Sequence, residues 1–329
     1  MIRTLGYARL KTGERLRLAA LSAPARRYAA AIRDFLAHKG QPWLMHVDLA
    51  NEGKVDKLRT TYYVGFLGAE IVGNVMIVGD GRAGILGHVY TRPDHRRKGV
   101  CQRLMLAALT GFCKGGGQAL SLGTGYNSPA YWIYHGFGFR SVEEGSGSMV
   151  LECVPGSLAR YFGPAGVRVT AARWEHWAGL SLLFAQPEGN LLRSKAYGIF
   201  GPAIFEGGFL QLQAQRERLG VQAQVLVTRA GHVVGAAILQ RDPGWPAEVH
   251  TLDIFVHPSF QGKLTDLLGA LEFPARGKVQ AYLDYPSSER VAALMGQGFR
   301  LEATLPRQLV RKGQCTDVLV YSRWGEQRG

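Results

Sequence analysis

The spacing of hydrophobic residues predicts alternating strands and helices in the first half of the chain. Runs rich in Val, Ile and Tyr are typical of strands, and apolar residues three and four positions apart are typical of helices. Glycine or proline separates most of these segments. The expected strands are 15–21, 60–67, 71–78, 84–91 and 118–124, the expected helices are 24–40, 99–114 and 128–136, and a polar, irregular stretch is expected between 40 and 60.

The order of these elements predicts a fold class. Antiparallel strands come first, a strand–helix–strand crossover follows, and a last pair of strands surrounds the turn EEGSGS (143–148). Crossover helices join parallel strands, whereas short turns join antiparallel ones. We therefore expect an α/β (α+β) fold with a mixed, mostly antiparallel sheet flanked by helices.

The second half of the chain repeats the pattern of the first. VGFLGAEIVGNVMI (64–77) aligns with LVTRAGHVVGAAIL (226–239), and both read as strand, glycine turn and strand. Three pairs of residues align in the same order: Gly73 with Gly235, Pro93 with Pro258, and Phe139 with Phe299. A repeat of this length indicates duplicated domains.

A segment rich in proline and glycine separates the two copies. The prediction is a first domain at 1–151, a linker at 152–166 and a second domain at 167–329. The length of 329 residues and the 47% of hydrophobic residues suffice for two buried cores.

Positive charge is concentrated in the first half. The chain has a net charge of +14, and residues 1–165 hold 21 Lys and Arg against 11 Asp and Glu. This balance favours an anionic ligand in the first half, although generic surface charge explains it equally well. A nucleic acid is not expected as the partner, because basic and aromatic residues are not interleaved in a recognised motif.

Other sequence features narrow the class of protein. No run approaches the roughly 20 apolar residues of a membrane span, and the N-terminus lacks the apolar core of a signal peptide. The cysteines show neither a C-x-x-C pair nor metal-ligand spacing, so we expect reduced thiols, a cytoplasmic protein and no metal. The four are Cys101, Cys113, Cys153 and Cys315.

The segment PDHRRKGVCQRL (93–104) predicts an anion site. Pro93 ends a strand, and Gly99 permits an unusual φ where the following helix begins. The first N–H groups of that helix have no intrahelical partner, and the helix dipole adds positive potential. Arg96, Arg97 and Lys98 would reinforce the attraction for phosphates.

Two motifs resemble those of the GNAT superfamily of N-acetyltransferases. The acyl-CoA signature of the family, [QR]-x-x-G-x-[GA], corresponds to Arg96–Cys101, with Cys101 where Gly or Ala is usual. The position of Cys101 at a helix N-terminus is expected to lower its thiol pKa, although a buried thiol without a catalytic role fits it better. The downstream motif of the family, N-x-x-A-x-x-[aliphatic]-Y-x-x-x-G-F, is matched by NSPAYWIYHGFGF (127–139).

This resemblance implies direct transfer of an acetyl group from acetyl-CoA to an amine. It implies that Tyr134 is the general acid for the leaving thiolate, although aromatic packing is the alternative role. Asn127 is expected to bind pantetheine or to cap the next helix. The residues expected to hold acetyl-CoA are Val89, Tyr90, Thr91, Arg96, Arg97, Lys98, Gly99, Val100, Cys101 and Asn127.

The sequence leaves the general base open. His88 lies on the key strand and is the base of the prediction, and His46, Asp48 and Glu52 are further candidates. Alternation from Thr91 would direct His88 away from the substrate, in which case it is a structural histidine.

The second copy departs from the family where chemistry occurs. Its counterpart of the anion loop, HPSFQGKLTDLL (257–268), is shorter and holds a single lysine in the loop. Leu294 stands where Tyr134 does, Ser287 where Asn127 does, and Arg290 where Ala130 does. We therefore expect a non-catalytic second domain that either shapes the acceptor cleft or serves folding alone.

The identity of the acceptor stays open. A small amine, an amino acid, an antibiotic, a polyamine and a peptide N-terminus are all compatible with the motifs. The alternative functions are an acyl-CoA sensor without turnover, transfer of a longer acyl group, and an RNA- or DNA-associated basic protein.

Overall fold

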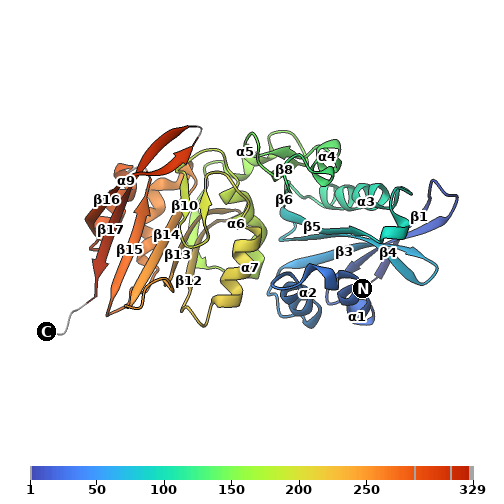
Figure 1. Ribbon diagram of the computed structural model, residues 1–329, viewed down its shortest axis with the longest axis horizontal. Helices are drawn as coiled ribbons and strands as arrows, with labels where there is room; N and C mark the ends of the chain where they lie inside the picture. The colour runs from blue at the N-terminus through green and yellow to red at the C-terminus, as the bar shows by residue number, and fades with distance from the viewer. Residues whose placement is uncertain (1, 285–286, 312, 326–329) are drawn as a thin grey trace. The chain divides into compact units, whose positions relative to one another are not determined.

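The computed structural model describes residues 2–284, 287–311 and 313–325. The chain divides into two compact units (Figure 1). Unit 1 consists of Met1–Leu158 and Arg173–Leu182, and unit 2 consists of Ala159–Ala172 and Leu183–Gly329. The change from unit 1 to unit 2 at Leu158 falls within the range 152–166 where the sequence predicts the linker. The return of Arg173–Leu182 to unit 1 has no counterpart in the predicted domain limits.

Unit 1 is built on an eight-stranded sheet in the order β1-β2-β3-β4-β5-β6-β8-β7. Every neighbouring pair is antiparallel except β5 and β6. Its elements are β1 Ile2–Arg9, β2 Arg15–Ser22, η1 Arg26–Tyr28, α1 Ala29–Leu36, η2 Ala37–Lys39, α2 Trp43–Glu52, β3 Arg59–Leu67, β4 Glu70–Gly79, β5 Ala83–Thr91, η3 Pro93–His95, α3 Val100–Lys114, β6 Ala119–Gly123, α4 Pro129–Gly136, β7 Arg140–Ser141 and β8 Ser148–Glu152. The predicted mixed, mostly antiparallel sheet flanked by helices is confirmed.

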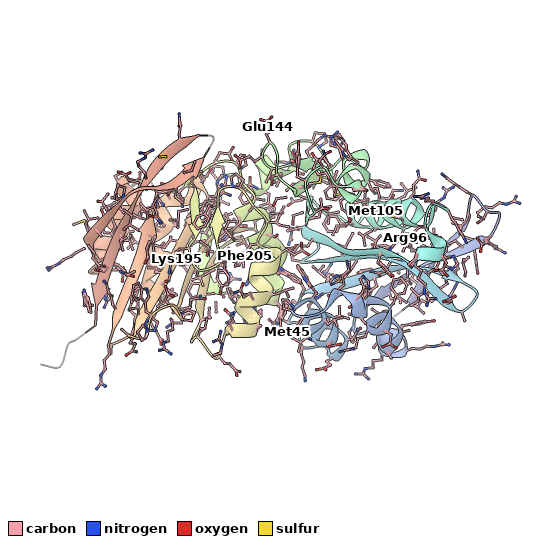
Figure 2. The ribbon with its side chains drawn as sticks, viewed as in Figure 1. Met45, Arg96, Met105, Glu144, Lys195 and Phe205 are labelled. Atoms are coloured by element: carbon pink, nitrogen blue, oxygen red, sulfur yellow. A yellow bond between two sulfur atoms is a disulfide. The ribbon has the colours of Figure 1, made fainter. Side chains whose placement is uncertain are left out.

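Helices cover both faces of this sheet (Figure 1). On one face, α3 buries Leu104, Met105 and Ala108 against the apolar side chains of the strands (Figure 2). On the other face, Phe35 of α1 packs on Tyr90 of β5, with ring centroids 5.2 Å apart. The sheet therefore separates an α3 side from an α1–α2 side, and β5 is reached from both.

Two elements in the N-terminal part of unit 1 were not predicted. The interval expected to be irregular contains α2, which buries Leu44, Val47 and Ala50 and ends at Gly53 with φ +76°. The three-residue spacing of these apolar positions is typical of a helix, but the polar residues between them obscure the pattern in the sequence. Strand β1 was missed because it is a largely exposed edge strand, which leaves no hydrophobic alternation to detect.

Unit 2 contains a seven-stranded sheet in the order β9-β12-β13-β14-β15-β17-β16. This order repeats β2-β3-β4-β5-β6-β8-β7 of unit 1, and the parallel pair, β14 with β15, lies in the matching place. The remaining elements of the chain are α5 Ser157–Tyr161, β9 Val167–Ala171, η4 Trp174–His176, α6 Trp177–Phe184, β10 Leu192–Ser194, β11 Ile199–Phe200, α7 Glu206–Gln215, β12 Gln222–Thr228, β13 Val233–Arg241, β14 Val249–Val256, η5 Pro258–Lys263, α8 Leu264–Gly269, β15 Lys278–Leu283, α9 Ser288–Gly296, β16 Arg300–Arg311 and β17 Gln314–Trp324.

The cysteines differ from expectation. Cys113 at the end of α3 and Cys153 after β8 form a disulfide, so the prediction of four reduced thiols is wrong. Their 40-residue separation hides the pairing in the sequence, whereas the fold brings their Cα atoms to 5.3 Å. Cys101 and Cys315 are free thiols.

Among the described residues, none of the helices combines the length and the apolar character that a membrane crossing requires.

Candidate active site

A bulge interrupts the pairing of β4 with β5. Asn74 pairs with Tyr90, but Met76 pairs with Gly87, so His88 and Val89 together face a single residue of β4. His88 has a φ of +50°, and its carbonyl accepts a hydrogen bond of 2.9 Å from the Asn74 amide. A bulge of this kind bends the strand and takes backbone groups out of the ladder.

Strand β5 also separates from β6. The two strands pair only from Ala83 to Ile85 of β5, although β5 continues to Thr91. Beyond Ile85 the backbone on that side of β5 therefore has no strand partner in the described part of the chain, and it is available to a ligand in an extended conformation.

A cleft of about 970 Å³ opens on the α3 side of this separation. It is bounded by the end of β5, by the loop before α3 and by one side of α4. Its lining includes Lys11, Val89, Tyr90, Thr91, His95, Arg96, Arg97, Gly99, Val100, Cys101, Gln102, Ala130, Trp132, Ile133 and Tyr134. Eight of the ten residues expected to hold the cofactor are therefore gathered in one cavity together with Tyr134.

The remaining two predicted cofactor residues do not line the cleft. The Lys98 ammonium lies 3.6 Å from a carboxylate oxygen of Glu14 in the β1–β2 turn. The Asn127 amide oxygen accepts a hydrogen bond of 2.8 Å from the Trp132 indole. Asn127 is also not the helix cap, because the Ser128 hydroxyl accepts the Tyr131 N–H at 3.2 Å.

The loop before α3 has the backbone of an anion site. Gly99 is the N-cap residue with φ +96°, and Arg97 also has a positive φ, +61°. Within the described chain, no side chain caps α3 and no acidic residue occupies its first turn. Arg96 lines the cleft, and its Nε donates a hydrogen bond of 3.2 Å to the Thr91 carbonyl. The N–H groups of the first turn are thus left for a ligand.

The reasoning from sequence missed two basic residues of the cleft. His95 lies inside the predicted anion site (93–104), so its position next to Arg96 and Arg97 could have indicated that it lines the cleft. Lys11 comes from the β1–β2 turn, and its N–H donates to the Lys98 carbonyl at 3.1 Å. Only the tertiary structure brings that turn to the anion loop.

Tyr134 is half-buried on α4 and lines the cleft. Its ring lies edge-on to Phe139, with centroids 6.1 Å apart. The half-buried Cys101 is close by, but burial raises the pKa of its thiol, so the expected lowering by the helix N-terminus does not prevail.

The candidate bases lie away from the cleft. Burial, with Lys39 and His38 nearby, lowers the pKa of His88 to about 3, and its Nε2 has no hydrogen-bond partner among the described residues. The His88 ring faces Trp43 of α2, on the α1–α2 side. His46 is fully buried, and its Nε2 lies 3.0 Å from the Thr60 hydroxyl.

The two acidic candidates are engaged elsewhere. Asp48 accepts a hydrogen bond of 2.9 Å from Arg33 Nε, and Glu52 lies 2.8 Å from Lys54 Nζ. Neither carboxylate lines the cleft.

Most of the residues that line the cleft lie in a region that matches a family model. Residues 59–141, from β3 to β7, match the family model of the acetyltransferase (GNAT) domain. This match agrees with the resemblance seen in the two sequence motifs.

Solved structures of acetyltransferases resemble about half of the chain. A GNAT superfamily phosphinothricin acetyltransferase from Sinorhizobium meliloti, in complex with AcCoA, is 19% identical, with a TM-score of 0.40 over 49% of this chain and 90% of its own. An N-acetyltransferase from Staphylococcus aureus Mu50 is 16% identical, with a TM-score of 0.40 over 49% of this chain and 99% of its own. A ribosomal-protein-alanine N-acetyltransferase from Brucella melitensis is 17% identical, with a TM-score of 0.37 over 48% and 99%. The full sequence matches none of the curated proteins with which it was compared.

Proposed function

We propose that unit 1 is an acetyl-CoA-dependent N-acetyltransferase that transfers the acetyl group directly to a primary amine. The observation that carries the proposal is the cleft of the GNAT domain. An uncapped helix N-terminus with its basic loop, an unpaired stretch of strand and a tyrosine line the same cavity. A thioester of CoA needs an anion site, a partner for its extended arm and a proton donor for its sulfur.

The donor is proposed to bind along the length of the cleft. Its pyrophosphate oxygens would accept hydrogen bonds from the N–H groups of Val100 and Cys101, and Arg96 and Arg97 would neutralise its charge. The pantetheine arm would pair with the backbone of 89–91 in the manner of an added strand. Lys98 and Asn127 would act from outside the cleft, by adding positive potential and by ordering the start of α4.

The chemistry is proposed to proceed without an acyl-enzyme. The lone pair of a neutral amine forms the C–N bond at the thioester carbonyl, and the C–S bond then breaks. The thiolate takes a proton from the Tyr134 hydroxyl, and the nitrogen loses one proton. Tyr134 recovers its proton from solvent, so one amide and one CoA thiol result.

Unit 2 is proposed to be a degenerate copy without catalysis. Strand β14 pairs with β13 without a register shift, so it lacks the bulge. The counterpart of the anion loop is the 3-10 helix η5, which leads directly into α8. The fully buried side chain of Leu294 occupies the place of Tyr134.

The proposal is tested by calorimetric titration with acetyl-CoA, followed by release of free thiol with a panel of primary amines. One binding site per chain and amine-dependent thiol release are expected. Binding without turnover of any amine would favour a sensor, and a failure to bind acetyl-CoA would overturn the proposal. Two equivalent sites per chain would overturn the non-catalytic assignment of unit 2.

A further inference from the structure

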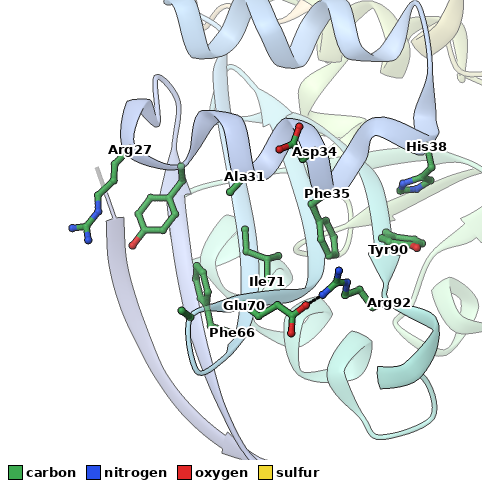
Figure 3. Close-up of a pocket in the computed structure, with 12 residues that line it drawn as sticks. Arg27, Ala31, Asp34, Phe35, His38, Phe66, Glu70, Ile71, Tyr90 and Arg92 are labelled. Atoms are coloured by element: carbon green, nitrogen blue, oxygen red, sulfur yellow. Dashed lines mark ion pairs between the residues drawn. The ribbon is translucent and has the colours of Figure 1, made fainter.

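A second cavity of unit 1 lies on the α1–α2 side of the sheet. This groove has a volume of about 680 Å³ and runs between α1 and the turn that joins β3 to β4 (Figure 3). It is lined by Arg27, Tyr28, Ala31, Asp34, Phe35, His38, Phe66, Ala69, Glu70, Ile71, Tyr90 and Arg92. In Figure 3, His38 and Tyr90 lie at one end, and Arg27 and Phe66 lie toward the other.

Tyr90 connects this groove with the donor cleft, because it lines both cavities. It belongs to the part of β5 that has left β6, next to the bulge at His88. An acceptor in the groove would therefore meet β5 from the face opposite to the donor. The unpaired segment of β5 is where the two substrates would come together.

We propose that the groove binds the acceptor as a primary amine on an aromatic or similarly flat apolar body, and that His38 takes the proton from its nitrogen. This inference rests on the proposed function, since it names the acceptor class and the base of the same reaction.

The walls of the groove favour an apolar body. Rings of Tyr28, Phe35, Phe66 and Tyr90 surround it, and Ile71 lies between its two ends. Aromatic side chains give much contact area at a small cost in conformational entropy. A flat apolar substrate would be stabilised by these walls more than a short polar amine.

Arginines around the groove disfavour a polycation. The guanidinium carbon of Arg17 lies 4.2 Å from the centroid of the Phe66 ring. Those of Arg27 and Arg96 lie 5.7 and 5.9 Å from the rings of Tyr28 and Tyr90. These ring faces are the places where a second cation would gain cation–π energy. A polyamine would meet like charge there, whereas a single amine on an apolar body needs only one polar end.

The polar end of the groove is suited to a single nitrogen. Glu70 is already paired with Arg92. Asp34 is exposed, and it lines the same groove as His38. The carboxylate would attract the ammonium form of the amine, and His38 would receive its proton.

The histidine ring is held in place for this role. It packs on the Tyr90 ring with centroids 4.0 Å apart. Burial and then Lys39 lower the pKa of His38, and a hydrogen bond with the Phe35 backbone opposes them. Asp34 on α1 and Tyr90 and Arg92 on β5 line the same groove as His38, and His88 on β5 is close enough for the charge of His38 to lower its pKa. A neutral ring that donates one N–H to a carbonyl keeps a lone pair on its other nitrogen.

Two buried atoms at the bulge add a place for a polar ligand. Asn74 lies opposite Tyr90 in the ladder and therefore on the same face of the sheet. The Asn74 Oδ1 and the His88 Nε2 are buried and have no partner among the described residues. A buried polar atom without a partner is unfavourable, so a polar ligand atom or water bound there gains free energy.

Protons and electrons balance in this scheme. The nitrogen lone pair forms the bond to the carbonyl carbon, the C–S electron pair leaves with sulfur, and Tyr134 protonates it. The proton that the nitrogen loses goes to His38 and then to solvent. No oxidant, reductant or further reactant is needed.

The acceptor groove is tested by filling it. Ala31→Phe adds bulk at an exposed, groove-lining position of α1, and Ala30→Phe adds the same bulk at the next exposed position, which lines a different cavity. The probes are phenethylamine, ethanolamine and spermidine, with acetyl-CoA saturating and thiol release as the readout. We expect phenethylamine to have the highest kcat/KM, and Ala31→Phe to raise its KM at least 10-fold with the KM of acetyl-CoA within twofold. Ala30→Phe should change neither.

The result separates this inference from the proposed function. If acetyl-CoA binds but Ala31→Phe leaves the amine KM unchanged, or spermidine is preferred, the groove assignment is overturned and the enzyme assignment stands. If acetyl-CoA binds and none of the three amines is turned over or detected by titration against the acetyl-CoA complex, the acceptor class is wrong. If acetyl-CoA does not bind, the failure belongs to the proposed function.

The role of His38 is tested by its pH profile. His38→Gln should lower kcat about 100-fold, the lower range of general base catalysis, with little change in the amine KM. His38→Gln should also abolish the fall in kcat at low pH (the acidic limb of the pH profile), because that fall reports protonation of the base. Lys39→Gln should move that limb to higher pH, because it removes a cation that lowers the pKa of His38. An acidic limb that persists in His38→Gln would overturn the assignment of the base.

Discussion

Strands β5 and β14 occupy the same place in two sheets with the same strand order, yet only β5 is distorted. In β5, one extra residue shifts the register against β4 and coincides with a positive φ at His88. In β14, the ladder with β13 runs from Gly235–Val256 to Arg241–His250 without a shift. The same architecture thus supports an open backbone in one unit and a closed one in the other.

The buried polar groups of the two strands also differ in how well they are hydrogen-bonded. His88 and Asn74 at the β5 bulge each have a buried polar atom without a partner among the described residues. Asp253 of β14 is buried too, but its carboxylate accepts the Ser194 hydroxyl at 2.5 Å and the N–H groups of Lys195 and Ala196. Satisfied groups hold a fold in place, and unsatisfied ones leave binding energy for a ligand.

The largest effect should come from removing the acid of unit 1. Tyr134→Phe should lower kcat about 1,000-fold with the affinity for acetyl-CoA nearly unchanged, because general acid catalysis contributes roughly 10²–10⁴-fold. Stopped-flow detection of the thiol with a saturating amine measures this. Tyr131→Phe is the control, since Tyr131 is on the same helix and its hydroxyl contacts Ser141 at 3.0 Å. Equal losses in both variants would assign Tyr134 to packing.

Acidification should destabilise unit 1 more than unit 2. In unit 1, burial lowers the pKa of His46 and His88 to about 3, so the unfolded chain binds protons first below roughly pH 6.5. Unit 1 should then lose about 3 kcal/mol of its free energy of unfolding at pH 5.5. In unit 2, burial raises the pKa of Asp253 to about 6, so the folded state binds the proton first. Protonation of Asp253 should add about 1 kcal/mol to the stability of unit 2 at pH 5.5, whereas His250 and His257, whose pKa is lowered by burial, act in the opposite direction.

Hydrogen exchange of amides in β4 and β13, corrected for intrinsic rates, reads out the two units separately. Between pH 7.0 and 5.5, protection factors should fall further in β4 than in β13. His46→Gln and His88→Gln should each remove part of the fall in β4. A fall of equal size in both strands would contradict the comparison.

The glycine before the helix that follows the anion loop should affect acetyl-CoA binding in unit 1 only. Gly99→Val should weaken acetyl-CoA binding about 30-fold, because a β-branched residue at φ +96° is strained by roughly 2 kcal/mol. Gly262→Val, in the counterpart loop, has space for the new side chain and no positive φ to oppose it. Titration calorimetry on both variants is the measurement, and similar losses of affinity would show that the two loops share a role.

The smallest expected effect concerns loop charge. Arg97→Ala should weaken acetyl-CoA binding about fivefold at low salt and less at high salt, because screening weakens exposed charge pairs. Lys263→Ala in unit 2 should leave the affinity unchanged. Affinities measured at 20 and 300 mM salt test both statements, and an equal loss in Lys263→Ala would point to a second donor site.

Much of the fold was accessible from the sequence because local patterns encode it. The strands 60–67, 71–78 and 84–91 correspond to β3, β4 and β5 with limits that differ by one residue at most. The helix expected at 24–40 is divided into η1, α1 and η2. The prediction failed for α2, where buried apolar residues alternate with polar ones, and for β1, where most residues of the strand are exposed.

The sequence by itself predicted the mixed, mostly antiparallel sheet and the anion loop, and through two motifs it singled out Tyr134, which lines the same cleft as that loop. These features depend on residues that are near one another in the chain, so their spacing carries the information. Only the tertiary structure decided that β5 has a bulge at His88, that Cys113 meets Cys153, and that Lys11 joins the anion loop. Each depends on a register shift or on contacts between distant segments, and a one-residue bulge redirects side chains without leaving a mark on the hydrophobic pattern.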